Sequence, residues 1–244
     1  MTSRFFAIWA WLTASHAALF GLFWLLLQVP ESNAAMLAAS ALLVLAITAL
    51  ACWAESAALL AWRGDAPARR LPRLALNGMP AVLAGFALFC LIAWATGHLS
   101  TAWMSRRGEI DAWLMLHFGW TRTARLHGTF EWMVAFIRYV IGISLALSVA
   151  STLVAAGWRA LARPSWLAVA FGYRRLLFIT AALMVFLWLP WRVVGWRPSW
   201  LHANWQELSF VSLKLGILYV LANAGWTLIV RIGRPAAPPQ SASV

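Results

Sequence analysis

Charged and titratable side chains inside apolar segments are the residues of this sequence that could do chemistry. The candidate ligand-binding residues are His16, Glu55, Glu131, Arg138, Glu207 and Lys214. A charge at mid-depth in a bilayer costs about 2.5–3.5 kcal/mol on insertion scales, so it needs a partner or a role there. The pattern identifies no catalytic residue, and it leaves open whether the protein is an enzyme.

Two of these residues are cations that follow an acidic residue at the same spacing. Arg138 lies seven residues after Glu131, and Lys214 lies seven residues after Glu207. Seven residues advance a helix by about 10 Å and return to nearly the same face. Each cation could pair with a neighbouring helix or reach toward the interface. Alternatively, both face one outward-open cavity and bind an anionic lipid headgroup. In either case, we expect them to avoid lipid chains.

Glu55 and His16 offer a different chemistry. Small residues surround Glu55, which predicts a close helix contact: Ala54, Ser56, Ala57 and Ala58. A buried glutamate is neutral or paired with a cation. His16 lies near the middle of the first apolar run. Together they suggest a further alternative, a small proton-coupled transporter.

Motifs for other chemistries are missing from the sequence. There is no Gly-x-Ser-x-Gly, no His-Glu-x-x-His and no P-loop. Cys52 and Cys90 lie in apolar runs without metal-ligand spacing. A haem would need a second histidine at the depth of His16, and His98 lies at a helix end. We therefore expect no metal and no cofactor.

The elements that position these residues follow from composition. Hydrophobic residues make up 63% of the 244 residues and charged residues 11%, which leaves too little polar surface for a soluble globule. A soluble enzyme, a disulfide-rich secreted domain and a disordered chain are excluded. The net charge of +12 comes from cations placed between apolar runs, so it indicates topology and not nucleic-acid binding.

Six apolar runs are long enough to cross a membrane. We predict helices at 5–29, 36–62, 79–99, 132–158, 176–196 and 208–230. The fold class is therefore all-α, a polytopic transmembrane helical bundle in a single domain over residues 1–234. The tail at 235–244 lacks an apolar period and is predicted to be disordered.

Arginine counting predicts the orientation. One side receives eleven arginines: Arg4, Arg63, Arg69, Arg70, Arg73, Arg159, Arg163, Arg174, Arg175, Arg231 and Arg234. The other side receives six: Arg106, Arg107, Arg122, Arg125, Arg192 and Arg197. The positive-inside rule then places both termini in the cytoplasm. Arg-rich inner loops with Trp-rich outer ends are typical of bacterial inner-membrane proteins.

The longest connection, residues 100–130, lies on the predicted outer side. Its segment from Ile110 to Trp120 has an apolar face and is too short to span, so we predict a helix lying in the interface. His117 and His127 could form a metal or acid–base site with Glu109 and Asp111. Their spacing matches no ligand pattern, which favours ordinary interfacial polar residues.

The last four helices could form two related hairpins. The segments 70–78 and 163–172 resemble each other, and each precedes an inward-to-outward helix. The Glu-x6-cation pattern opens both return helices. Coincidence between apolar helices is the competing explanation, and both interpretations stay open.

The function favoured by these observations is a membrane-embedded binding, transport-accessory or assembly subunit without catalysis. The first alternative is an enzyme or carrier that handles an anionic lipid through Arg138 and Lys214. The second is the proton-coupled transporter with Glu55 and His16. The expected partners are the lipid bilayer and, depending on the alternative, an anionic lipid or other membrane subunits.

Overall fold

The computed structural model describes residues 2–30, 32–64, 67–121, 123–194 and 204–233. The α-helices are α1 Thr2–Gln28, α2 Ala34–Arg63, α3 Leu71–Ser105, α4 Arg107–Phe118, α5 Ala124–Ala135, α6 Gly142–Ala156, α7 Ser165–Ala170, α8 Tyr173–Leu183, α9 Leu189–Val194 and α10 Asn204–Ile232. Two 3₁₀ segments, η1 Ala68–Arg70 and η3 Trp158–Ala162, and two π-helical segments, η2 Phe136–Ile141 and η4 Met184–Trp188, connect or interrupt them. No strand occurs in these ranges, so the predicted all-α class is confirmed. The predicted tail at 235–244 lies outside the described residues.

Six of the helical stretches are long and apolar enough to cross a membrane. They are Ser3–Gln28, Ala34–Arg63, Leu71–Ser105, Ala124–Ala156, Tyr173–Val194 and Leu208–Ile232. Each contains most of one predicted apolar run, so the six predicted helices are confirmed. Length and composition of this kind suggest a multi-pass membrane protein.

Local sequence signals explain where several helices begin and end. The side chain of Asn33 accepts a hydrogen bond from the Met36 amide and caps the start of α2. Gly64 ends α2 in the left-handed conformation, with φ of 75°, and its amide donates to the Leu60 carbonyl. Gly157 ends α6 with φ of 73°. The second helix, predicted at 36–62, therefore ends within one residue of its predicted end.

The third helix is longer than the prediction of 79–99. α3 runs from Leu71 to Ser105 and continues through Pro80 without interruption. Pro72 sits in its first turn, where the missing N–H would have no helical partner. An internal proline removes one hydrogen bond, and packing along a 35-residue helix offsets that local loss. The predicted range of 79–99 was therefore too short at both ends.

The predicted outer connection, 100–130, is almost entirely helical. α3 ends and α5 begins inside it, and α4 occupies Arg107–Phe118 between them. The helix predicted from Ile110 to Trp120 is therefore present, and Gly119 ends it with φ of 66°. Leu114 is buried, whereas Leu116 is 82% exposed. Its position in a membrane interface stays a prediction.

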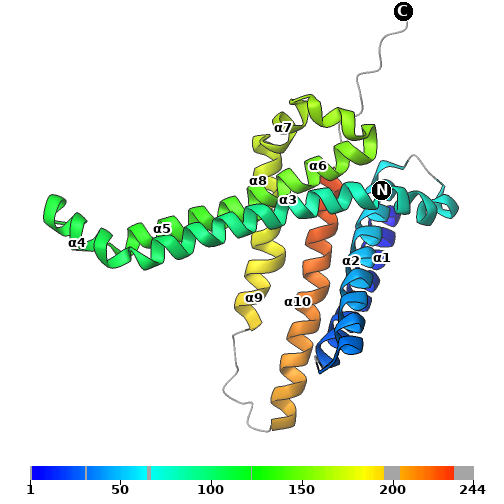
Figure 1. Cartoon of the computed structure of the whole chain (residues 1–244), viewed down its shortest axis with the longest axis horizontal. Helices are drawn as coiled ribbons and strands as arrows, with labels where there is room; N and C mark the ends of the chain where they lie inside the picture. The colour runs from blue at the N-terminus through cyan, green and yellow to red at the C-terminus, as the bar shows by residue number, and fades with distance from the viewer. Residues whose placement is uncertain (1, 31, 65–66, 122, 195–203, 234–244) are drawn as a thin grey trace, which may run out of the picture.

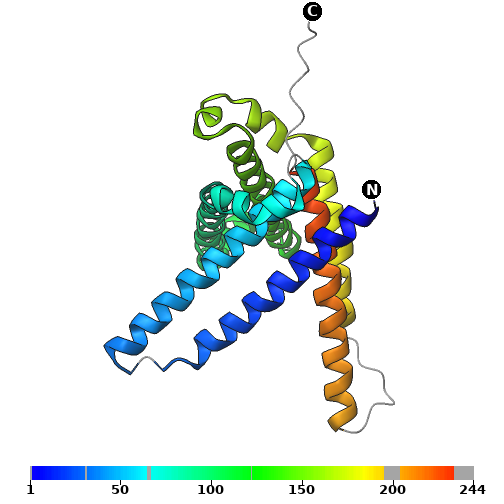
Figure 2. The same cartoon turned by 90° about the vertical axis from the view of Figure 1, so that its right-hand side faces the viewer.

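The six long helices form three hairpins that diverge from one packed region (Figures 1 and 2). The hairpins are α1 with α2, α3 with α5–η2–α6, and α8–η4–α9 with α10. We call the packed region the hub. Its buried members are Ile8, Leu12, Ala58, Leu59, Trp62, Val140, Leu147, Ala150, Ile179, Ala182, Ile229 and Val230. Beyond the hub, large apolar side chains such as Trp24, Leu42 and Leu213 are more than half exposed.

Small residues let the hairpins approach each other near the hub. Ser56 and Ala58 are fully buried in α2, and a Cβ atom on Gly78 of α3 would collide with the Ser56 hydroxyl. Further along α3, a Cβ atom on Gly85 would lie 2.5 Å from the Ala146 carbonyl oxygen of α6. The close helix contact predicted around Glu55 is therefore confirmed.

The second and third hairpins differ in their backbones. The π-helical segment of the second hairpin, η2, lies in its return helix, whereas η4 lies in the first helix of the third hairpin. These positions do not correspond under the proposed repeat. The repeat itself stays a prediction.

Candidate functional site

His16 and Glu55 lie side by side between α1 and α2. The Nε2 atom of His16 is 3.3 Å from Oε1 of Glu55, and α10 completes the group. The indole Nε1 of Trp226 donates to the same carboxylate oxygen at 2.7 Å. The Nδ1 atom of His16 is 2.5 Å from Oδ1 of Asn223. We call His16, Glu55, Asn223 and Trp226 the polar cluster.

The hydrogen bonds of Asn223 assign the proton on Nδ1 of His16. The amide nitrogen of Asn223 donates to the Tyr219 carbonyl at 2.9 Å, one turn earlier on α10. That bond turns the amide oxygen toward His16. An amide oxygen only accepts, so Nδ1 of His16 must carry the hydrogen.

One further proton is needed between His16 and Glu55. A carboxylate oxygen and an unprotonated Nε2 are both acceptors, so their contact requires a hydrogen on one of them. That proton makes either an imidazolium beside a carboxylate or a neutral imidazole beside a carboxylic acid. Both arrangements are electrically neutral. Loss of the proton leaves one net negative charge among apolar helices, which is costly.

The neighbouring helices supply no formal charge close to the polar cluster. Cys52 lies one turn before Glu55 on α2 and is buried. Tyr219 on α10 donates its hydroxyl hydrogen to the Thr13 carbonyl of α1. The next cations along α2 and α10 are Arg63 and Arg231, at the helix ends. Arg63 follows Glu55 by eight residues, about 12 Å along a helix, and Arg231 follows Asn223 by eight residues and Trp226 by five. The charge of the cluster therefore depends on the shared proton.

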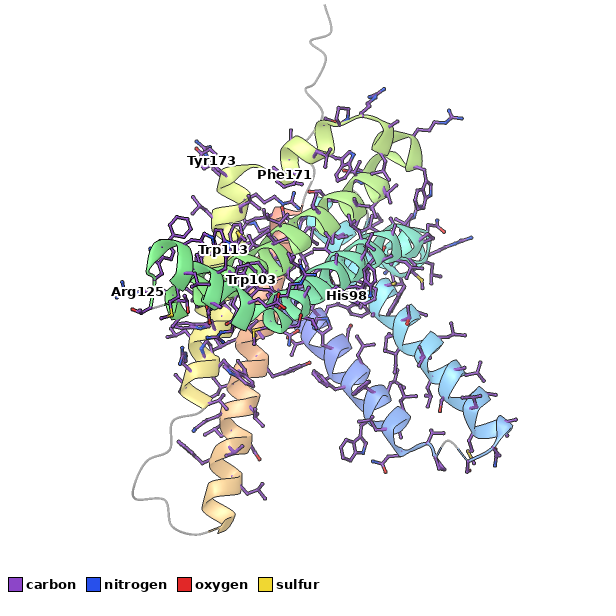
Figure 3. The ribbon with its side chains drawn as sticks, turned by 60° about the vertical axis from the view of Figure 1, so that its left-hand side comes forward. His98, Trp103, Trp113, Arg125, Phe171 and Tyr173 are labelled. Atoms are coloured by element: carbon purple, nitrogen blue, oxygen red, sulfur yellow. The ribbon has the colours of Figure 1, made fainter. Side chains whose placement is uncertain are left out.

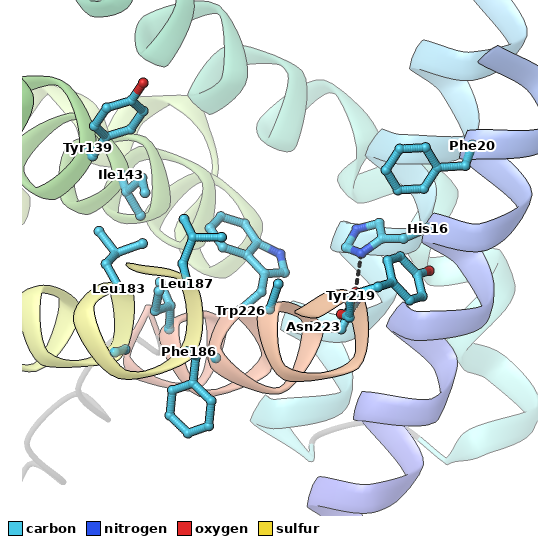
Figure 4. A pocket seen from close by; sticks show the side chains of 14 residues that line it. His16, Phe20, Tyr139, Ile143, Leu183, Phe186, Leu187, Tyr219, Asn223 and Trp226 are labelled. Carbon is cyan, nitrogen blue, oxygen red and sulfur yellow. Dashed lines mark hydrogen bonds between the residues drawn. The ribbon is translucent and has the colours of Figure 1, made fainter. Parts of the chain in front are cut away.

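A cavity of about 370 Å³ adjoins the polar cluster between the three hairpins (Figure 4). His16, Asn223 and Trp226 form part of its wall. The rest is apolar or aromatic: Phe20, Tyr139, Ile143, Ala182, Leu183, Phe186, Leu187, Tyr219, Ala222, Gly225 and Ile229. Phe20 is 64% exposed and Leu187 is 47% exposed, so the cavity opens outward between the helices.

Both π-helical segments contribute to this cavity. η2 carries Tyr139, and η4 carries Phe186 and Leu187. On the opposite side, a Cβ atom on Gly225 of α10 would lie 2.5 Å from Cβ of Phe186, so only glycine allows this approach. Single-turn π segments are frequent at functional sites, because they re-aim side chains within a helix.

Arg138 and Lys214 are not brought together. Nε of Arg138 donates to the Thr96 hydroxyl of α3 at 2.9 Å, whereas Nζ of Lys214 donates to the Val194 carbonyl of α9 at 2.9 Å. Neither lines the cavity. Lys214 is 9% exposed and also lies over the Phe210 ring. Such contacts with neighbouring helices match the structural interpretation of these cations, not the shared-cavity interpretation.

The structure describes the side chain of only one of the two glutamates that precede these cations. Glu131 lies in α5 with an exposed side chain, and Arg138 bonds to Thr96 instead of reaching toward it. Glu207 lies in α10, but its side chain is outside the part of the chain that the structure describes. Glu131 and Arg138 therefore do not pair with each other, and the pairing of Glu207 with Lys214 stays a prediction.

A second polar group fastens α4 to α3 and α5. Trp103 donates from Nε1 to Nδ1 of His127 at 3.0 Å, and Nε2 of His127 is 2.7 Å from Oδ1 of Asp111. Trp103 only donates, so the hydrogen of neutral His127 lies on Nε2 and points at Asp111. The hydrogen bonds from His127 and then Thr123 lower the pKa of Asp111 below its ordinary value of 3.8.

Two of the four residues considered for a site in the outer connection, His127 and Asp111, lie in contact with each other. Both nitrogens of His127 are occupied, and His117 instead stacks on Trp113, at 4.7 Å between ring centroids. Among the described residues, no three His, Cys, Asp or Glu side chains gather as a metal site. Figure 3 shows Trp103 and Trp113 at the end of the hairpin, near Arg125.

Several residues of the polar cluster and the cavity wall were not identified from the sequence. Asn223, Trp226 and Tyr219 are spread along the sixth apolar run and carry no charge. The i, i+4, i+7 spacing of Tyr219, Asn223 and Trp226 was a usable signal, because it places three polar atoms on one helix face. Arg175, counted as an inner-loop cation, is instead 7% exposed in α8, where Nη2 donates to the Ser144 carbonyl.

Comparison with protein families, curated proteins and solved structures finds no match to this chain. The functional argument therefore depends on the geometry of the polar cluster and its cavity.

Proposed function

We propose that this chain is a small proton-coupled transporter of a bacterial inner membrane, with six spans and both termini in the cytoplasm. The ligand binds in the cavity between the hairpins, and the His16–Glu55 pair takes up or releases one proton. The observation that carries this proposal is the contact between these two residues, 3.3 Å apart, because His16 also forms part of the cavity wall.

Two further features support proton coupling. The polar cluster joins α1, α2 and α10, so a change in its charge acts on the contacts between the first and third hairpins. The cavity lies between all three hairpins, so movement at these contacts changes its shape. A proton and a ligand that each favour one arrangement are necessarily coupled.

The orientation is supported by the positions of the arginines. The start of α1 and the ends of α2 and α10 all lie at the hub, together with Arg4, Arg63 and Arg231. Arg4 packs against Gly64, and the Arg231 guanidinium lies 5.5 Å from the Trp62 ring centroid. A cytoplasmic hub agrees with the positive-inside rule.

The other two functions receive less support. A binding, accessory or assembly subunit needs no titratable pair inside the membrane, although the exposed outer parts of the hairpins suit other membrane subunits. An anionic-lipid enzyme or carrier needs Arg138 and Lys214 at one site, and their partners lie on α3 and α9.

The proton shared by His16 and Glu55 can be detected by ¹⁵N NMR of histidine-labelled protein in lipid bilayers. Near neutral pH, Nδ1 of His16 should be protonated and Nε2 should report a shared proton. Glu55→Gln should abolish the shared-proton signal and shift the titration of His16. Glu109→Gln, an exposed carboxylate on α4, is the matched control and should leave His16 unchanged. A His16 titration that is identical in Glu55→Gln and wild type would refute the proposal.

A further inference from the structure

We infer that the cavity takes a lipophilic organic monocation, which replaces the proton shared by His16 and Glu55. This inference rests on the proposed proton coupling and specifies the ligand of the same site. It follows from the charge of the polar cluster, the composition of the cavity wall and the opening between the hairpins.

Charge balance favours a cationic ligand. With its shared proton, the polar cluster is neutral; without it, the cluster carries one negative charge on Glu55. Along α2 and α10, the formal cations Arg63 and Arg231 follow Glu55 and Asn223 by eight residues, about 12 Å, and both lie at helix ends. A single positive charge in the cavity would restore neutrality, whereas an anion would add a second negative charge.

The cavity wall suits a cation that is itself apolar. Five of its residues are aromatic: Phe20, Tyr139, Phe186, Tyr219 and Trp226. Aromatic faces attract organic cations through the ring quadrupole, most strongly where water is excluded. The indole of Trp226 is held by its bond to Glu55, so its ring connects the charged group to the cavity wall. Ca²⁺ and Mg²⁺ need about six or more oxygen ligands, whereas this wall is mainly apolar and aromatic.

The orientation of the ligand in the cavity follows from which residues line each side of the cavity. His16 and Asn223 lie at one side of the cavity, and Leu183, Phe186 and Leu187 lie at the other (Figure 4). The cationic centre should therefore approach His16 and Trp226, with the apolar body toward η4. The exposed Phe20 and Leu187 mark an opening through which a membrane-soluble molecule could enter from the bilayer.

The exchange is balanced in charge and protons. The protonated cluster and a free cation give a cation-bound cluster and one proton, which passes to water. No covalent bond other than N–H or O–H changes, and no redox partner is needed. Competition for one site makes the apparent affinity for the cation rise about tenfold for each pH unit while one proton is displaced.

The experiment uses two probes of similar shape and opposite charge, tetraphenylphosphonium and tetraphenylborate. Isothermal titration of the full chain in lipid nanodiscs, in two buffers of different ionisation enthalpy, measures affinity and proton release together. Tetraphenylphosphonium should bind with release of one proton and with the stated pH slope. Tetraphenylborate should bind more weakly and release no proton.

Variants separate the charge from the apolar wall. Glu55→Gln should remove proton release and the pH slope, whereas Glu109→Gln should keep both. Tyr139→Leu, at the edge of the cavity, should lower the affinity for tetraphenylphosphonium about two- to fivefold, since one aromatic face is lost. It should leave proton release intact. Tyr139 is 48% exposed, so this variant is expected to fold.

The outcomes distinguish the inference from the proposed function. Equal, pH-independent binding of both probes would show apolar partitioning and would overturn the cation inference. If tetraphenylphosphonium displaces no proton while the His16 titration still depends on Glu55, the ligand class is wrong and the proton site stands. If His16 does not respond to Glu55→Gln, both fail. Accumulation of tetraphenylphosphonium in proteoliposomes, driven by an imposed pH gradient and lost in Glu55→Gln, would establish exchange transport.

Discussion

The hydroxyl of Ser56 on α2 occupies the space into which a Cβ atom on residue 78 of α3 would project. Gly78 and Ser56 are both buried, and the Ser56 hydroxyl has no hydrogen-bond partner among the described residues. Ser56 directly follows Glu55 of the polar cluster, so the backbone of α2 beside the cluster lies as close to α3 as a hydroxyl allows. Glu55 is rotated by about 100° from Ser56 around α2 and contacts His16 and Trp226.

Gly78→Ala should destabilise the protein, because the new methyl group overlaps Ser56. Overpacking of a tight contact costs about 1–3 kcal/mol. Ser56→Ala alone should be nearly neutral, since it removes an unpaired hydroxyl. The double variant should recover much of the loss. Thermal unfolding in one detergent measures all three, and additive effects of the two substitutions would contradict the contact.

Glu55→Ala should destabilise more than Glu55→Gln. Alanine leaves the Trp226 indole N–H and His16 without their acceptor, at about 1–3 kcal/mol for each unsatisfied group. Glutamine keeps an oxygen for Trp226. The same unfolding measurement tests this order, with Glu109→Ala as the control. Equal stability of wild type and Glu55→Ala would mean that the hydrogen bonds to Glu55 contribute nothing.

The contact between Asp111 and His127 should persist at neutral pH and weaken only in acid. The pKa of Asp111 is lowered in the folded protein, so its stabilising effect is complete above the ordinary value of 3.8. It is lost as the pH falls through the lower, folded value. Hydrogen exchange of α4 at neutral pH should speed up in Asp111→Ala and change less in Asp111→Asn, whose oxygen still accepts from His127. Unchanged exchange in Asp111→Ala would show that this contact does not hold α4.

Thr96→Val should disturb Arg138, because it removes the hydroxyl that accepts from Nε. We expect a loss of about 0.5–1.5 kcal/mol in unfolding free energy, more if the guanidinium finds no other acceptor. Thr96→Ser keeps the acceptor and is the control.

Retention of anionic lipid should be the same in Arg138→Gln, Lys214→Gln and wild type. Loss of lipid in both cation variants would instead favour the anionic-lipid function.

The predicted topology is tested by fusions at both ends. With cytoplasmic termini, a fluorescent protein at the C-terminus should be bright, and alkaline phosphatase there should be inactive. A fusion after Phe118, on the opposite side, should behave in the reverse way. An active phosphatase at the C-terminus would invert the orientation and place the hub outside the cytoplasm.

The sequence predicted the helices well because apolar length is a local property. All six spans lie where the hydropathy placed them, and the Arg63-Gly64 helix end follows from glycine's conformational freedom. The third helix was predicted too short because the prediction followed the apolar run alone, whereas α3 extends beyond that run at both ends. Whether a helix passes through Pro80 depends on the packing of α3 against α2 and α6, which a local signal does not contain.

The candidate site was predicted only in part. His16 and Glu55 were recognised individually, because a titratable group in an apolar run is visible in sequence. Their contact joins residues 39 positions apart, and Asn223 is 207 positions from His16. Spacing along one chain does not encode such distances. The matching of Arg138 with Lys214 failed for the same reason, since identical spacings in two helices say nothing about the distance between those helices.

The divergence of the hairpins from the hub has a consequence for biosynthesis. Each hairpin pairs two adjacent spans, so each can enter the membrane as a unit while the ribosome is still making the next one. The polar cluster cannot form until α10, which carries Asn223 and Trp226, has been synthesised. Until then, His16 and Glu55 in the first hairpin lack their α10 partners and can pair only with each other. A chain truncated after Gly157 should therefore insert both finished hairpins yet leave the first one abnormally sensitive to a membrane protease. Full protection of that truncated chain would show that the first two hairpins assemble without the third.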